Sequence, residues 1–60
     1  MKLTEKELFM IKNQLTQEKQ LIEIYKTYSE ICNDPEIRLK CESLIGKHQT
    51  HYDKLFGLLN

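Results

Sequence analysis

The sequence predicts an all-α protein: an antiparallel two-helix hairpin that dimerises into a four-helix bundle. Three observations support this prediction. Apolar residues recur at heptad spacing in two long segments, an Asn-Asp-Pro-Glu tetrapeptide separates these segments, and no alternation of apolar and polar residues indicates a strand. We therefore expect helices over about residues 4–32 and 35–59, in a single domain that spans residues 1–60.

The first helix is expected to begin at Thr4, because Thr4 followed by Glu7 is the pattern of a capping box. A heptad stripe, apolar at most positions, then runs through Leu8, Ile11, Leu15, Glu18, Ile22, Tyr25, Ser29 and Cys32. A second apolar set widens this face beyond a two-stranded seam: Met10, Leu21, Ile24, Tyr28 and Ile31. Neither glycine nor proline interrupts the segment.

The tetrapeptide over 33–36 predicts the turn. Asn33 can take the left-handed conformation that ends many helices, and Asp34 can cap the next one. Pro35 suits the first helical position, and Glu36 adds a favourable charge at the helix N-terminus. A turn this short forces the two helices to be antiparallel.

The second helix has its own stripe: Ile37, Cys41, Leu44, His48, His51, Leu55 and Leu58. Its flanking apolar residues are Ile45, Tyr52 and Leu59. Gly46 weakens the helix by about 1 kcal/mol relative to alanine but permits a close neighbour. Both helices thus have apolar faces wider than one partner can cover, and such patches rarely stay exposed. We therefore predict an obligate homodimer of two hairpins related by a two-fold axis.

Glu18, His48 and His51 place ionisable groups on otherwise apolar stripes. Folding the chain at Asp34 puts residue i opposite roughly residue 67 − i, so Glu18 faces His48 and His51. By the same rule Tyr25 faces Glu42 and is expected to hydrogen-bond it at the edge of the core. Buried charge is costly unless it is paired, hydrogen-bonded or bound to metal.

Three interpretations of this polar layer stay open. The first is a metal site for iron, manganese or zinc, because imidazole and carboxylate are good ligands for these ions and bundles build sites from facing helices. The second is a hydrogen-bonded network that sets the register. The third is partial exposure of the two histidines between the helices.

The two cysteines are expected to be free, buried thiols. Cys32 and Cys41 lie about 9 Å or more apart along the bundle axis, which is too far for easy bridging. Phe9 and Phe56 are expected near each other at the open end of the hairpin. They either cover the end of the bundle or form a docking patch for a protein partner.

Charge and hydropathy exclude several classes of function. Nine basic and nine acidic residues cancel, so nothing indicates a nucleic-acid partner. No apolar run approaches the roughly 20 residues of a membrane span, and the first residues lack the apolar core of a signal peptide. We expect a cytoplasmic protein without a hydrolase triad or a phosphate-binding loop.

Four short segments resemble a known family: LTQEKQLI over 15–22, YKTY over 25–28, DPE over 34–36 and HQTHY over 48–52. The chain is similar to short spore coat protein F-like chains of endospore-forming bacteria. The resemblance implies a ferritin-like, rubrerythrin-like fold and an association with the spore, with coat proteins as partners.

The chain departs from the di-iron pattern of ferritin-like enzymes. Those proteins use two Glu-x-x-His pairs and two further glutamates. Here Ile45 stands three residues before His48, and Glu42 lies off the stripe. We therefore expect a non-enzymatic structural or interaction protein, with metal binding by Glu18, His48 and His51 as the alternative.

Overall fold

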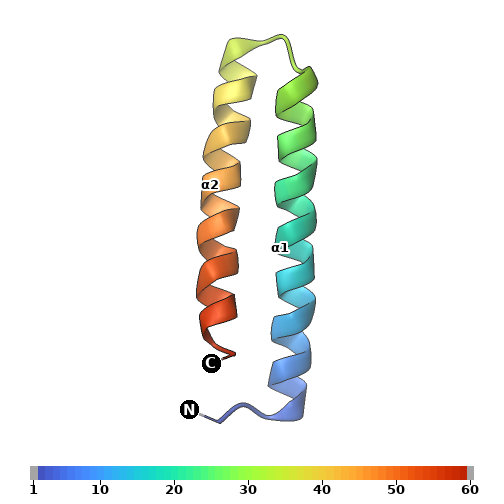
Figure 1. The fold of residues 1–60 in the computed structure, drawn as a ribbon, viewed down its shortest axis with the longest axis vertical. Helices are drawn as coiled ribbons and strands as arrows, with labels where there is room; N and C mark the ends of the chain where they lie inside the picture. The colour runs from blue at the N-terminus through green and yellow to red at the C-terminus, as the bar shows by residue number, and fades with distance from the viewer. Residues whose placement is uncertain (1, 60) are drawn as a thin grey trace.

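A computed structural model describes residues 2–59 of the chain as an antiparallel helical hairpin. Helix α1 spans Glu5–Ile31 and helix α2 spans Pro35–Gly57, and both chain ends lie at the open end of the hairpin (Figure 1). The described part of the chain contains no strand. The predicted all-α hairpin is confirmed: α2 begins at the predicted residue, and the other three helix ends lie one or two residues inside the predicted limits.

The predicted capping box starts α1. The Thr4 hydroxyl accepts a hydrogen bond from the Glu7 backbone N–H at 3.1 Å, and the Thr4 N–H donates to Glu7 Oε1 at 3.0 Å. Two of the helix's first N–H groups would otherwise lack a partner. Because both bonds are local in sequence, the cap fixes the start of α1 independently of its packing on α2.

The turn over residues 32–34 confirms one expectation and corrects another. Asp34 caps α2, since its Oδ1 accepts from the backbone N–H groups of Glu36 at 2.9 Å and Ile37 at 3.3 Å. Pro35 is the first residue of α2, as predicted. Asn33 does not adopt the left-handed conformation, and no described residue has positive φ. The chain instead leaves α1 in an extended conformation at Cys32 and enters α2 from an extended Asp34.

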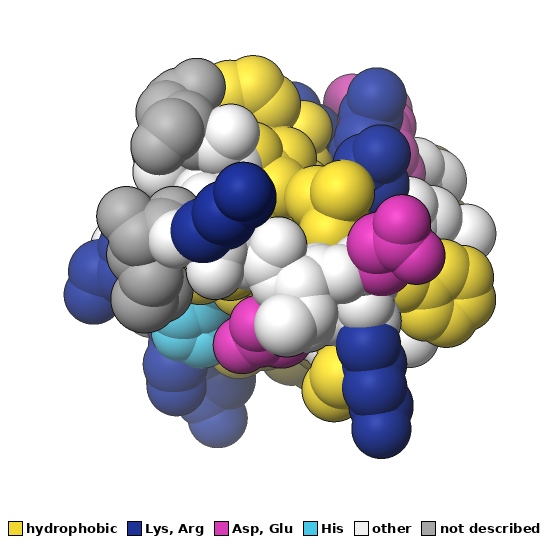
Figure 2. Space-filling model, turned by 90° about the horizontal axis from the view of Figure 1, so that it is seen from below, with side chains coloured by type: hydrophobic (Ala, Val, Ile, Leu, Met, Phe, Trp, Pro, Cys, Tyr) yellow, Lys and Arg dark blue, Asp and Glu magenta, His cyan; other side chains and the backbone are white. Residues whose placement is uncertain are grey.

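The seam between the helices contains a small core. Leu15, Ile22 and Cys41 are its buried apolar residues, and Glu18 is buried among them at 6% exposure. Many other large apolar side chains are exposed: Phe9, Met10, Ile24, Tyr28, Ile31, Ile37, Leu39, Phe56 and Leu58. A view along the helices from the open end shows hydrophobic surface between charged side chains (Figure 2).

Several details of the second stripe differ from the prediction. Ile37 and Leu58 belong to the stripe but are exposed; Ile37 lies in the first turn of α2, and Leu58 is its C-cap residue. A Cβ added at Gly46 would meet nothing within 4 Å, so this glycine admits no close neighbour within the hairpin. Both cysteines are free, as predicted, but only Cys41 is buried. Within residues 2–59, neither helix is long and apolar enough to cross a membrane.

Candidate functional site

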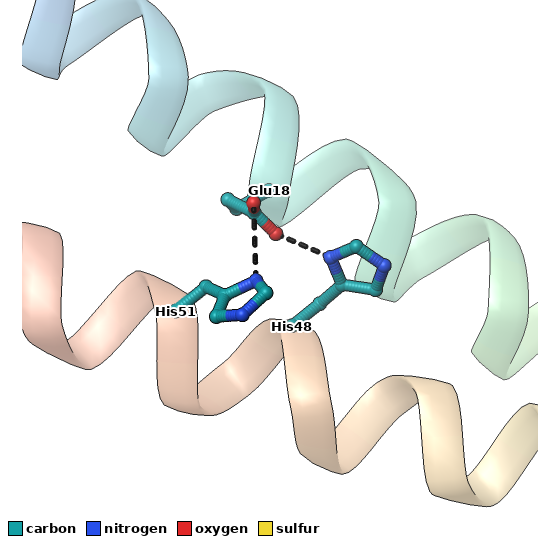
Figure 3. A group of neighbouring side chains, drawn as sticks. All are labelled: Glu18, His48 and His51. Atoms are coloured by element: carbon teal, nitrogen blue, oxygen red, sulfur yellow. Dashed lines mark hydrogen bonds and ion pairs between the residues drawn. The ribbon is translucent and has the colours of Figure 1, made fainter.

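The structure brings together the three polar residues of the stripes. Nδ1 of His48 lies 2.5 Å from Oε2 of Glu18, and Nδ1 of His51 lies 3.7 Å from Oε1 of the same carboxylate. Glu18 extends from α1, and the two imidazoles point towards it from successive turns of α2 (Figure 3). Residues three apart share a helical face, so the carboxylate is shared between two rings.

Exposure increases across this cluster from the core to the surface. The side chain of Glu18 is 8% exposed, that of His48 is 18% exposed, and that of His51 is 45% exposed. Glu18 therefore has its polar contacts mainly with protein groups, whereas one face of His51 meets solvent. The third interpretation, partial exposure of the two histidines between the helices, agrees with both values, and the exposure is larger for His51.

Neighbouring side chains hold the three residues in place. Gln14 lies one turn before Glu18, and its Nε2 donates a hydrogen bond to Oε1 at 3.5 Å. The ring of Tyr25 stacks on His48 with centroids 5.8 Å apart, and His48 and His51 meet edge to face at 5.7 Å. The sequence analysis did not identify Gln14 as part of this cluster. Its position four residues before Glu18 places it on the same helical face and could have identified it.

The contacts of Glu18 favour its ionised form. The hydrogen bond from His48 lowers the pKa of Glu18 below the ordinary value of 4.5, although burial acts in the opposite direction. Charge on His48, the Gln14 amide and charge on His51 also lower this pKa, in decreasing order of effect. Glu18 is therefore a carboxylate at neutral pH and accepts hydrogen bonds from both helices.

Among the described residues, the expected contact between Tyr25 and Glu42 is not formed. Phe9 and Phe56 were expected to lie near each other at the open end, and they do not form an aromatic pair. Glu42 is exposed, and no hydrogen bond between described residues joins it to Tyr25, which stacks on His48 instead. Phe56 stacks on Tyr52 with centroids 6.1 Å apart, and no aromatic pair of described residues joins it to Phe9. Phe9 and Phe56 are 65% and 51% exposed, so each is available for contact with another molecule.

The donor set fits a single metal ion better than a pair. Glu18, His48 and His51 each offer one ligand atom, and these three atoms lie within 4.8 Å of one another. No other group of this kind occurs in the part of the chain that the structure describes. A di-iron centre of the ferritin type uses four carboxylates and two histidines, and this cluster contains a single carboxylate.

Comparison with known proteins gives no match: no family model, no curated protein and no solved structure matches the chain. Function is therefore inferred from the contacts, burial and charges described above.

Proposed function

We propose that this chain is a non-enzymatic structural or interaction protein that acts as a symmetric homodimer, in which two hairpins form a four-helix bundle. The observation that supports this proposal is the amount of surface that one hairpin leaves exposed. The accessible surface of the chain is 5036 Å². A compact monomer of this mass, 7.2 kDa, would expose about 4,100 Å².

The excess of about 900 Å² matches what a second copy would cover. A standard protein–protein interface buries about 800 Å² on each partner. The hairpin measures 46 × 14 × 11 Å, so its length provides one long side for such a contact. A second hairpin of the same length covers that side with a single isologous interface.

The outer face of α1 is the surface we assign to this contact. Met10, Ile24, Tyr28 and Ile31 are 59%, 59%, 44% and 73% exposed. Ile24, Tyr28 and Ile31, with Thr27 and Glu23, line a shallow groove along the helix. The formal net charge is zero, so two copies approach without long-range repulsion.

The occupant we propose for this face is a second copy. In a four-helix bundle, each helix packs its apolar surface against two neighbouring helices. In a single hairpin, each helix has only one such neighbour. The resemblance to short spore coat protein F-like chains favours a role as a building block of the spore coat. Within that role, Phe9 and Phe56 at the open end would contact coat partners.

Sedimentation equilibrium at several micromolar concentrations tests the proposal. We expect the mass of two chains, with helicity and dimerisation lost together on dilution, because obligate dimers lack a stable folded monomer. A chain that sediments as a folded monomer in this range, with the helical circular dichroism spectrum retained, would exclude the dimeric bundle.

A further inference from the structure

We propose that Glu18, His48 and His51 form a mononuclear binding site for a divalent transition-metal ion, with Zn²⁺ bound more tightly than Fe²⁺ or Mn²⁺. This metal site is a property beyond the structural role proposed above. The three residues supply two imidazole nitrogens and one carboxylate oxygen from facing helices. This ligand set occurs in mononuclear zinc sites and in non-haem iron sites.

The positions of the donor atoms suit one ion. Metal–ligand distances of about 2.0–2.2 Å place the ligand atoms of a tetrahedral ion roughly 3.3 Å apart. In the protein the two Nδ1 atoms lie beside different oxygens of Glu18: Nδ1 of His48 is 2.5 Å from Oε2, and Nδ1 of His51 is 3.7 Å from Oε1. One ligand atom from each of the three residues lies within 4.8 Å of the others. Small rotations of the side chains would therefore admit the ion, and the two helices need not separate.

The carboxylate is already held in a ligating orientation. Gln14 donates to Oε1 of Glu18, and Tyr25 stacks on the ring of His48. Such neighbours orient the ligands of metal sites and raise their affinity for the ion.

The site would keep one coordination position open. Three protein ligands leave a fourth position for water, as in zinc sites that exchange their outer ligand. The side chain of His51 is 45% exposed, so this side of the cluster gives the ion a path from solvent. Binding moves the proton of a neutral His48 from Nδ1 to Nε2, because the lone pair of Nδ1 must face the metal.

The preference for zinc follows from the mononuclear N₂O donor set. Affinity of such sites for divalent ions rises from Mn²⁺ through Fe²⁺ towards the end of the first transition row, and Zn²⁺ binds more tightly than Mn²⁺ or Fe²⁺. A bridged pair of metal ions shares carboxylate ligands between its two metals. A site with a single carboxylate therefore favours one ion.

Calorimetric titration with Zn²⁺ and with Mn²⁺ tests the site in the full chain. Cys32→Ser serves as the background, because a partly exposed thiol is a zinc ligand that would compete with the site. We expect one Zn²⁺ per chain and weaker binding of Mn²⁺. At a free Zn²⁺ concentration about 100-fold above the dissociation constant, Tm should rise by roughly 10–20 °C.

Two ligand variants and one control assign the binding to these residues. Glu18→Gln and His51→Gln should each weaken Zn²⁺ binding at least tenfold, and His51→Gln disturbs the fold least because its side chain is half exposed. Glu30→Gln removes the same charge from an exposed position on α1 and should bind as the background does. Absence of Zn²⁺ binding in the background protein would overturn the proposal. Equal affinity of His51→Gln and Glu30→Gln would overturn it too, even if Glu18→Gln failed to fold.

Discussion

Replacing Ile24 with lysine tests whether the outer face of α1 is a dimer interface. Ile24 is 59% exposed in the hairpin, so it has more than half of its surface left to bury. Lysine is a good helix former, so the substitution leaves the stability of α1 itself nearly unchanged. Any large effect therefore reports on contacts that Ile24 makes with a second copy.

The size of the effect follows from that exposed fraction. Full burial of an isoleucine side chain contributes about 1.5–3 kcal/mol, so the exposed 59% corresponds to about 0.9–1.8 kcal/mol. A symmetric dimer contains this contact twice, which gives about 1.8–3.5 kcal/mol. Since about 1.4 kcal/mol changes an affinity tenfold, the dissociation constant should rise roughly 20- to 300-fold. The cost of desolvating the lysine ammonium adds to this effect.

Sedimentation equilibrium over a range of concentrations measures the two dissociation constants. Thr50→Lys is the matched control, because it adds the same charge at an exposed polar position on α2. We expect its dissociation constant to stay near that of the natural chain. Equal dissociation constants for Ile24→Lys and Thr50→Lys would refute the assignment of this face, and the exposed residues of α2 would then be the next candidates.

Three further predictions concern the hairpin itself. The pKa of Glu18 is lowered in the folded protein, so its contribution to stability is present above about pH 4.5 and is lost as the pH falls through the lower folded value. Thermal melts should show this loss below pH 4.5 and a smaller one in Glu18→Gln, whereas an equal loss in both proteins would show that Glu18 does not cause it. Glu18→Leu should change the free energy of unfolding by less than about 1 kcal/mol or raise it, because added apolar burial offsets the lost hydrogen bond from His48. A decrease of more than about 3 kcal/mol in urea denaturation would show that His48 is left with an uncompensated charge. Gly46→Ala should raise the free energy of unfolding by about 1 kcal/mol, because the added methyl group meets open space, and a decrease in the same assay would place Gly46 in a dimer contact.

The helices and their pairing were predictable because their causes are local. The Thr4–Glu7 box and the Asp34–Pro35 start depend on neighbours within three residues, and the structure contains both. The three-residue connection leaves little freedom in how far one helix slides along the other. For this reason the simple folding rule was enough to bring Glu18 opposite His48 and His51.

The partner of Tyr25 was not predictable from the register alone. Side chains on a helix lean towards its N-terminus, so in an antiparallel pair those of α1 lean away from the turn and those of α2 lean towards it. Tyr25 therefore meets His48, which lies farther from the turn than the rule allows, while Glu42 leans away from it. The exposure of Ile37 and Leu58 was not predictable either, because a repeating pattern gives the face on which a residue lies but not how much of its side chain the opposite helix covers.

The short turn also bears on why Glu18 is buried. Buried polar residues in helical bundles commonly select one register among several, at a cost in stability. In this hairpin the capped turn over residues 32–34 already fixes the register of α2 on α1. A carboxylate is therefore not needed to align the two helices of one chain. Its remaining uses are to bind a cation with the two histidines or to select one arrangement of two hairpins, and only the first requires both imidazole Nδ1 atoms to face the same carboxylate.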